Sequence, residues 1–374
     1  MVGDCFLEFR IRCPVADAVS ACRRAGVHAG SHSVKTDGAV INVLKGGEGP
    51  PLLLIHGHPE THVTWHKIAA ELAREYTVVL PDLRGYGHSS KPDGRERQVN
   101  YSFRAMAQDQ VETMRHFGYE RFFVAGHDRG ARAAHRLCLD HPDTVLKVCV
   151  MDIVPTLTMY RDTNKEFATR YVWWFLQIQP FPMPEHIIGL DPEYYLREHL
   201  GVQGKTPGAV TPEAMAEYLR CYCCSGTIHA ACEDYRAAAD IDLEMDEADD
   251  KSGRKMTAPV LALWGARELL EKCGMSWKRG ARKLHRLPGK PWTVGTFSRK
   301  SSQKRSLPSF ASFSEGKISA MRPVFRWEMW QFTGVRPICG HPLCVPSNRS
   351  TRTARWTDST TRTTQRSASR SKRT

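Results

Sequence analysis

The chain contains 374 residues, of which 41% are hydrophobic, and it carries a formal net charge of +13. About 270 residues suffice for one domain with a sizeable core, and no window approaches the roughly 18 consecutive apolar residues of a membrane span. The first 34 residues mix charges throughout, unlike a signal peptide, and the 12 cysteines lack the two separated pairs of a zinc site. We therefore expect a cytoplasmic protein with free thiols, no bound metal and no membrane partner.

The positive charge is concentrated in residues 273–374, which hold 22 of the 53 Lys and Arg residues and 3 of the 40 Asp and Glu residues. The remainder has a net charge of −6, which is typical of a mildly acidic enzyme. The end of the chain is a low-complexity run of Ser, Thr and Arg, so we expect a largely disordered tail. Such a tail can contact phosphates non-specifically, and we expect no other nucleic-acid partner.

Runs typical of strands alternate with helical patterns from about residue 34 onwards. Strands are expected within residues 50–59, 76–82, 121–125, 145–152 and 258–265, and helices within residues 65–75 and 102–117. This alternation predicts an α/β fold with a mainly parallel sheet. Residues 1–33 show no pattern that we can assign.

A helical, aromatic-rich stretch interrupts the strand pattern between residues 156 and 250. No strand run occurs there, and the strand pattern returns only near residue 258. This arrangement predicts a helical cap inserted between the first part of the core, residues 34–155, and its continuation, residues 251–272.

The most informative motif is Gly126-His127-Asp128-Arg129-Gly130, which follows an apolar run directly. A strand that enters a tight turn with small flanking residues is typical of a nucleophile elbow. An Asp at its centre favours attack on carbon and formation of an ester. The alternative is an Asp that only caps a helix. Because His58, Asp128 and Asp152 all follow expected strand ends, we expect them to share one cleft.

Several segments resemble the α/β-hydrolase superfamily, and closely the haloacetate (fluoroacetate) dehalogenases. They are HGHPETHVTWHKIA, DLRGYGHSSKP, NYSFRAMAQDQVE, GHDRGARAAHRLCLDHP, VMDIVPT and CEDYRAAADIDLE. The resemblance covers roughly residues 46–271 and implies the α/β-hydrolase fold. It also implies hydrolysis of a haloacetate to glycolate and halide through an aspartyl ester, with water as second substrate and no cofactor.

The resemblance assigns roles to four residues around the elbow. Asp128 is the expected nucleophile, and Asp152 is the acid that orients the catalytic His. Arg129 and Arg132 are expected to hold the substrate carboxylate, because guanidinium forks bind carboxylates in a bidentate manner. The position of Arg129, next to the nucleophile, makes this role stronger for Arg129 than for Arg132.

The resemblance also implies an oxyanion hole formed by the backbone N–H groups of His58 and Arg129. The side chains of Trp174 and Tyr235 are expected to donate hydrogen bonds to the departing halide. Trp173 is a further candidate, although it stands where the relatives carry a His. The loss of that donor favours chloroacetate or bromoacetate over fluoroacetate as the substrate.

The general-base His is missing from its expected place, since residues 294–304 contain no His. If the codons there are read one base out of phase, they can encode Gly-His-Phe-Leu-Pro-Glu-Glu, which resembles the sequence of the family at this position. This indicates a shift of the reading frame near Cys273. His285 and His341 lack the context of the motif. Without the base, and without the last strand and helix, we expect alkylation of Asp128 without release of product.

Two alternatives stay open at this stage. An epoxide hydrolase shares the Asp nucleophile and the ester step, whereas a hydrolase-like protein without the base His would be catalytically impaired. The resemblance is also compatible with a homodimer. Three further titratable residues in the cap have no motif of their own and are interpreted as structural: His229, Glu233 and Asp234.

Overall fold

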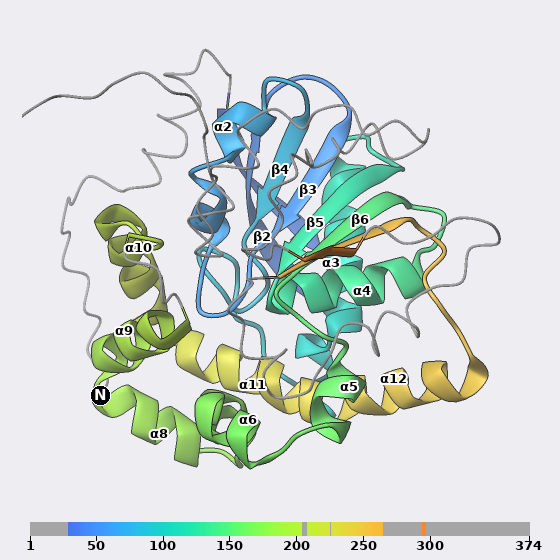
Figure 1. The fold of residues 1–374 in the computed structure, drawn as a ribbon. Coiled ribbons are helices and arrows are strands. Elements are labelled where there is room, and N and C mark those ends of the chain that lie inside the picture. Colours follow the sequence, from blue (N-terminus) through green and yellow to red (C-terminus); the bar gives the residue numbers. More distant parts are fainter. Residues whose placement is uncertain (1–28, 204–207, 225, 265–293, 297–374) are drawn as a thin grey trace, which may run out of the picture. The chain divides into compact units, whose positions relative to one another are not determined.

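The computed structural model describes residues 29–203, 208–224, 226–264 and 294–296. Most of the expected N-terminal segment, the end of the core continuation and nearly all of the basic tail therefore lie outside the described residues. The described part confirms the α/β fold, with one sheet in the order β1-β2-β4-β3-β5-β6-β7-β8 (Figure 1).

The strands of this sheet fall into an antiparallel and a parallel part. The pairs β1–β2 and β2–β4 are antiparallel, whereas the pairs from β4 through β3, β5, β6 and β7 to β8 are parallel. The strands are β1 (Ala29–Thr36), β2 (Ala39–Gly46), β3 (Pro51–Ile55), β4 (Thr77–Pro81), β5 (Phe122–His127), β6 (Val145–Met151), β7 (Val260–Trp264) and β8 (Val294–Thr296).

The two ends of the sheet differ from the sequence prediction. Strand β1 begins at Ala29, inside the segment that showed no assignable pattern. The strand was missed because most of its residues are polar and half of them are exposed. The expectation that the last strand is missing is wrong, since the short strand β8 pairs with β7. This pairing satisfies backbone groups of β7 that would otherwise form an open edge.

The core helices lie between the parallel strands in the sequence. The helix expected within residues 65–75 is short, with a 3-10 turn preceding four α-helical residues, whereas the helix expected within residues 102–117 is present. The Ser102 hydroxyl caps this second helix by accepting a hydrogen bond from the Ala105 N–H. The elements are η1 (His62–Trp65), α2 (Ala69–Leu72), η2 (Glu96–Tyr101), α3 (Phe103–His116) and α4 (Arg129–Asp140).

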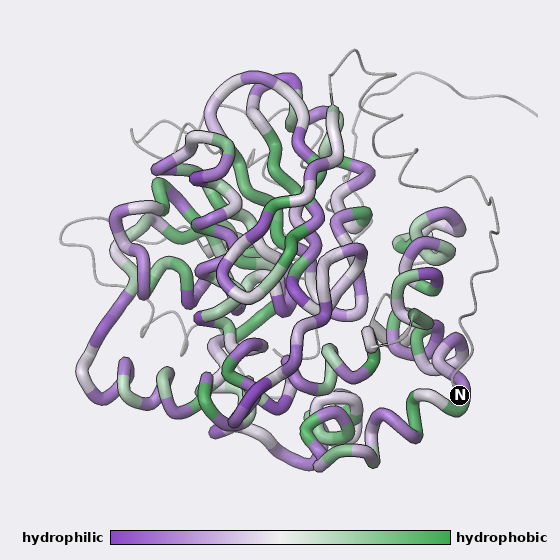
Figure 2. The backbone as a smooth tube through the Cα atoms, turned by 180° about the vertical axis from the view of Figure 1, so that it is seen from behind, coloured by the Kyte–Doolittle hydropathy of each residue, from purple (hydrophilic) through white to green (hydrophobic). Residues whose placement is uncertain are grey.

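Eight further helices lie between β6 and β7 in the described part of the chain, where the sequence predicts a cap. They are α5 (Thr156–Arg161), α6 (Lys165–Arg170), α7 (Val172–Gln177), α8 (Met183–Leu190), α9 (Pro192–Gln203), α10 (Pro212–Tyr222), α11 (Thr227–Ala239) and α12 (Ile241–Ser252). Apolar and polar stretches recur along these helices (Figure 2), as expected for helices with one buried face. None of the described helices combines the length and apolar character that a bilayer crossing requires.

The hydrophobic core lies on both faces of the sheet. In β3, Leu53 and Ile55 belong to one buried cluster, whereas Leu52 and Leu54 belong to another. Successive side chains of a strand point to opposite faces, so the uninterrupted apolar run is explained by burial on both sides. This rigid central strand positions the loop that follows it, which begins at His56.

Candidate active site

Asp128 lies in a strained turn between strand β5 and helix α4. Its backbone dihedrals are φ 48° and ψ −119°, a left-handed conformation that costs about 1–3 kcal/mol in a residue other than Gly. Both flanking glycines are sterically required. A Cβ atom at Gly126 would lie 2.5 Å from the Gly130 carbonyl oxygen, and one at Gly130 would lie 2.3 Å from the His56 carbonyl oxygen.

The carboxylate of Asp128 is directed away from a capping role. It makes no capping hydrogen bond to helix α4; instead its Oδ1 accepts a hydrogen bond of 3.0 Å from the backbone N–H of His58. Although burial opposes ionisation, the charges of His127 and Arg132, the His58 N–H and Arg129 together lower the pKa of Asp128. The carboxylate is therefore ionised at neutral pH, as attack on carbon requires.

The backbone N–H of His58 lies where the predicted oxyanion hole requires a donor, because it contacts the carboxylate of the expected nucleophile, Asp128. The close approach depends on Gly57, where a Cβ atom would lie 2.5 Å from the Cβ of Asp128. The second expected donor, the N–H of Arg129, belongs to the first turn of α4, where N–H groups lack an acceptor within the helix.

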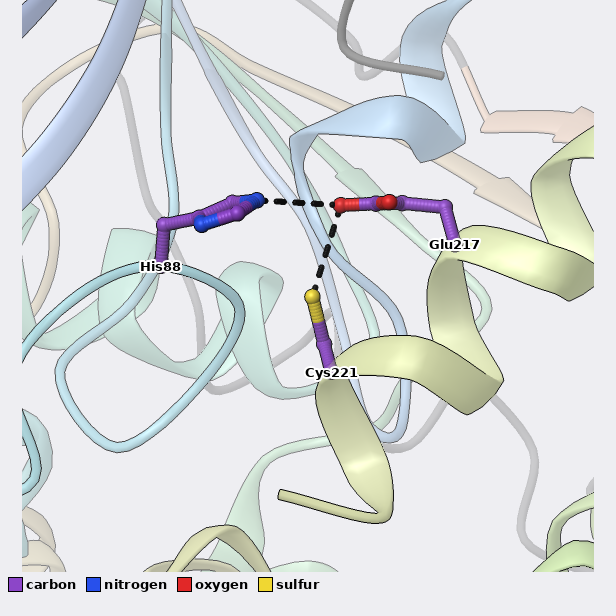
Figure 3. A group of neighbouring side chains, drawn as sticks. All are labelled: His88, Glu217 and Cys221. Atoms are coloured by element: carbon purple, nitrogen blue, oxygen red, sulfur yellow. Dashed lines mark hydrogen bonds and ion pairs between the residues drawn. The ribbon is translucent and has the colours of Figure 1, made fainter. Parts of the chain in front are cut away.

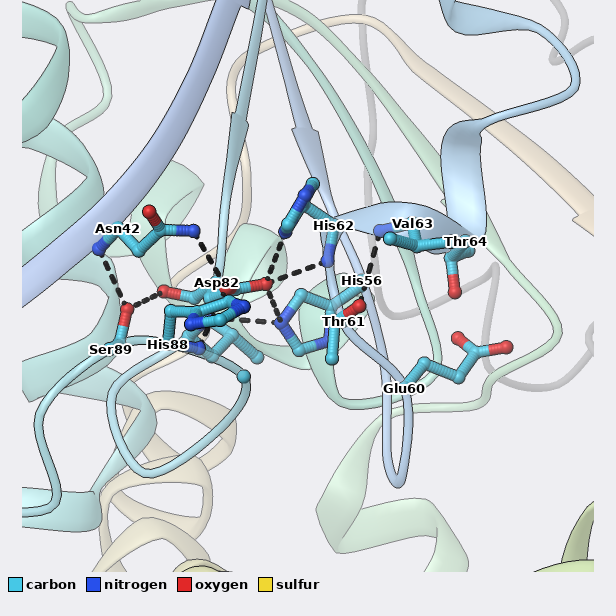
Figure 4. A network of polar contacts seen from close by, with 12 residues as sticks. Asn42, His56, Glu60, Thr61, His62, Val63, Thr64, Asp82, His88 and Ser89 are labelled. Atoms are coloured by element: carbon cyan, nitrogen blue, oxygen red, sulfur yellow. Dashed lines mark hydrogen bonds and ion pairs between the residues drawn. The ribbon is translucent and has the colours of Figure 1, made fainter. Parts of the chain in front are cut away.

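Asp82 holds together the two loops beside this site (Figure 4). Its Oδ1 accepts hydrogen bonds from the backbone N–H of His62 at 2.7 Å and interacts with the His62 ring at 2.9 Å, while its Oδ2 accepts from the His88 N–H and the Asn42 amide. Although burial opposes ionisation, the neighbouring His62 and His56 hold the pKa of Asp82 far below its usual value. Asp82 thus fixes the loop that carries His58.

Arg129 extends from the elbow into a buried ion pair. Its Nε donates to Oδ2 of Asp234 at 2.9 Å, and its Nη2 contacts both Oδ1 and the backbone carbonyl of that residue. The guanidinium also lies 4.2 Å from the ring centroid of Tyr235 and 4.6 Å from that of Phe103. Its remaining nitrogen, Nη1, is buried and has no hydrogen-bond partner among the described residues.

Arg132, one helical turn further along α4, has a different environment. Its Nη1 donates to the Val154 carbonyl at 2.9 Å and to the Thr156 hydroxyl at 3.1 Å, and its guanidinium lies 4.8 Å from the ring centroid of Trp174. Its Nε is buried and unpaired within the part of the chain that the structure describes. Burial and the positive charge of Arg129 lower the pKa of Arg132, so this cation would gain from an added anion.

These contacts change the relative importance of the two arginines. The sequence favoured Arg129 as the carboxylate ligand, but Asp234 already neutralises Arg129, whereas Arg132 forms no ion pair within the described ranges. The interpretation of Asp234 as structural missed this contact with the expected substrate-binding residue. The sequence did contain an indication that Asp234 belongs to the site, because this residue directly precedes the halide-site candidate Tyr235 in the CEDYR segment.

The aromatic residues expected to bind halide lie in two different places. Trp174 and Tyr235 are buried, with ring centroids 5.7 Å apart and planes nearly perpendicular, and both lie near Arg129. Trp173 instead contacts His199, with ring centroids 4.4 Å apart. Thus a His does lie against Trp173, but it comes from helix α9, which the sequence analysis did not single out.

Asp152 follows strand β6 with φ 52°, and its backbone N–H donates to the Leu263 carbonyl at 2.9 Å. It lies close enough to His127 to favour the charged imidazole. Although burial opposes that charge, Glu60, Asp128 and Asp152 raise the pKa of His127 to about 9. His127 is therefore protonated at neutral pH and unsuited to act as a general base. Residues 297–304, where the base was sought, lie outside the described residues.

Two clusters combine residue types that bind metals, but an arginine occupies each of them. In the first, the His88 ring lies 3.2 Å from Glu217, which also accepts from the Cys221 thiol (Figure 3). Arg220 contacts all three of these side chains. In the second, composed of Glu185, His229 and Glu233, Arg236 binds both carboxylates. A cation is thus already present at each cluster.

The chain was compared with known proteins. Residues 50–178 match the family model described as alpha/beta hydrolase fold. A fluoroacetate dehalogenase of Burkholderia sp is 46% identical over 231 residues, which is 62% of this chain and 75% of the relative. A soluble epoxide hydrolase of Corynebacterium sp. (strain C12) is 30% identical over 67% of this chain and 85% of its own length.

Solved structures also match. A protein of Nostoc sp PCC 7120, described as a putative alpha/beta hydrolase, superimposes with a TM-score of 0.66 and 53% sequence identity, over 69% of this chain and 89% of its own. The region matched by the family model contains both the elbow at Asp128 and the loop that carries His58. This region also contains Asp152 and Trp174, whereas Asp234 and Tyr235 of the cap lie beyond it.

Proposed function

Because this chain belongs to the haloacetate dehalogenase family of α/β-hydrolases, we propose that it binds a haloacetate and attacks its α-carbon with Asp128. The observation that carries the proposal is a pair of buried guanidinium nitrogens, Arg129 Nη1 and Arg132 Nε, which have no hydrogen-bond partner among the described residues and lie on the helix that Asp128 begins. Unsatisfied donors of two buried cations are costly, and a small carboxylate supplies the acceptors they lack.

The first chemical step transfers the carboxymethyl group to the enzyme. One carboxylate oxygen of Asp128 forms a bond to the α-carbon, and the carbon–halogen bond breaks with both electrons leaving on the halide. Trp174 and Tyr235, which lie around the two arginines, are proposed to solvate that halide. Holding the carboxylate fixes the direction of attack and removes much of the entropic cost of the reaction.

The second step hydrolyses the ester on Asp128. A water molecule adds to its carbonyl carbon, and the negative charge that develops on the carbonyl oxygen is stabilised by the N–H of His58. Glycolate then leaves, and Asp128 keeps one oxygen from water. This step needs a base to take the proton from water, with Asp152 proposed to orient it. Because residues 294–304 lack the His that is expected to serve as this base, we propose that the ester persists.

Intact mass spectrometry after incubation with chloroacetate tests the proposal. We expect a persistent carboxymethyl adduct at Asp128, with about one halide ion released per chain. Asp128→Asn should remain unmodified, and Asp143→Asn, which alters an exposed carboxylate, should react like the original chain. Absence of both adduct and halide release would refute the function, whereas rapid release of glycolate from unmodified protein would refute the arrested second step.

An epoxide hydrolase is the second candidate. In its favour, the buried hydroxyl of Tyr222 has no hydrogen-bond partner in the described part of the chain, and its ring lies 6.0 Å from that of His58. A cap tyrosine could polarise an epoxide oxygen. Two cationic side chains beside Asp128 favour an anionic substrate instead. Parallel incubations with chloroacetate and styrene oxide distinguish the two functions, because only the true substrate should modify Asp128.

A further inference from the structure

Asp234 of the cap connects the elbow to the core loop that follows strand β4. Its carboxylate is fully buried, with Oδ2 accepting hydrogen bonds from Arg129 Nε at 2.9 Å and from the Tyr86 hydroxyl at 2.7 Å, and with Oδ1 contacting Arg129 Nη2. Helix α11 therefore supplies a carboxylate that occupies one whole edge of the Arg129 fork. Only Nη1 of that fork remains available to a ligand.

This contact determines how much positive charge the site offers. The charges of Arg129 and Asp234 cancel each other, and so do those of His127, the residue before Asp128, and Glu60, which lie 3.2 Å apart. Arg132 is a buried cation for which no carboxylate lies within ion-pair distance in the described ranges. The site thus presents two directed donors but only one cation that is not already held in an ion pair.

We propose that Asp234 is a positioning residue that sets the charge selectivity of the site, by cancelling the charge of Arg129 and fixing the direction of its free N–H. This inference rests on the proposed function and deepens it. In this arrangement Arg132 provides the charge that attracts a substrate, and Arg129 provides a hydrogen bond. The site therefore accepts a small acid with one negative charge and disfavours an anion of similar size with two.

Two unreactive probes of different charge test this inference, and the affinity of each is measured by isothermal titration calorimetry on the full chain. Acetate carries one negative charge, and methylphosphonate carries two at a pH where it is fully ionised. The original chain should prefer acetate. Asp234→Asn leaves Arg129 uncompensated, and one further unit charge at short range in a partly desolvated site should shift the preference toward methylphosphonate by about tenfold or more.

A double variant distinguishes selectivity control from a purely structural role. Arg129→Gln combined with Asp234→Asn removes both charges, so the net charge and the preference for acetate should return toward those of the original chain. A structural role predicts no such recovery. The double variant also guards against misfolding of the single one, because removing both partners of a buried pair is less costly than removing one.

Two control variants show whether the shift in preference is specific to Asp234. Asp246→Asn, on helix α12, breaks an ion pair with Arg136 of helix α4 and should leave the preference unchanged. Tyr86→Phe keeps every charge and should weaken binding of both probes alike. An unchanged preference in Asp234→Asn, or no recovery in the double variant, would overturn this inference alone. Failure of the original chain to bind acetate would overturn the proposed function together with the inference.

Discussion

The imidazole Nδ1 of His127 lies 3.2 Å from the Oε2 oxygen of Glu60, directly beside the strained turn at Asp128. This buried contact joins the end of β5 to the loop after β3, two segments 67 residues apart. Glu60 also accepts a weak hydrogen bond of 3.4 Å from the N–H of Gly57, the residue before the proposed oxyanion donor His58. The pair therefore links the proposed nucleophile Asp128 to the loop that carries His58.

The His127–Glu60 pair predicts a loss of stability at alkaline pH. The folded state holds the proton of His127 up to a pKa of about 9, whereas the unfolded chain loses it near 6.5. This contribution is thus fully present below pH 6.5 and is lost as the pH rises to about 9. The shift corresponds to about 3 kcal/mol, which partial exposure of the ring reduces to about 2 kcal/mol.

Denaturant unfolding at a series of pH values measures this effect. His127→Gln should flatten the stability profile between pH 6.5 and 9. A slope in the variant that equals that of the original chain would show that another group is responsible.

Arg132→Ala should weaken the use of haloacetate more than it weakens folding. Arg132 is the buried guanidinium without an ion pair in the described residues, so its removal takes away the charge that attracts the substrate. We expect the chloroacetate concentration for half-maximal alkylation to rise by about 100-fold. Arg132→Lys should recover only part of this loss, because an ammonium group cannot reproduce the planar fork. If Arg132→Ala left the chloroacetate concentration for half-maximal alkylation unchanged, the proposed role of Arg132 in substrate binding would be contradicted.

Gly130→Ala should destabilise the elbow by about 3 kcal/mol or more. Its new Cβ atom would lie 2.3 Å from the His56 carbonyl oxygen and 2.4 Å from that of Ile55, both of them backbone atoms that cannot move aside. Gly189→Ala is the matched control, since a Cβ atom there meets nothing within 4 Å. That change should be neutral or stabilise helix α8 by about 0.5–1 kcal/mol. Equal midpoints of thermal unfolding for both variants would disprove the steric requirement.

Trp174→Phe should affect halides unequally. The change keeps an aromatic ring beside Arg132 but removes the indole N–H. Because fluoride is the halide that depends most on hydrogen bonds, the alkylation rate with fluoroacetate should fall about tenfold further than that with bromoacetate, which corresponds to about 1.4 kcal/mol. Parallel time courses by intact mass supply the ratio. A ratio that does not change would remove Trp174 from the halide site.

Some features could be predicted from the sequence because short-range patterns determine them. The buried strands β3 and β5 follow continuous apolar runs, β6 follows a mostly apolar one, and the Gly-x-Asp-x-Gly spacing indicates a tight turn that only small flanking residues allow. The hairpin formed by β1 and β2 was missed because an exposed edge strand lacks such a run. The position of Asp128 was therefore determined by the sequence itself.

Charge pairing was decided only by the tertiary structure. Arg129 and Asp234 are 105 residues apart, and His199 reaches Trp173 from a different helix of the cap. No local pattern specifies which buried carboxylate meets which arginine, because that depends on how the cap helices pack. Burial makes such contacts strong by removing competing water. The sequence thus identified Asp128 as the candidate nucleophile, while packing decided which neighbouring arginine is left without an ion pair among the described residues.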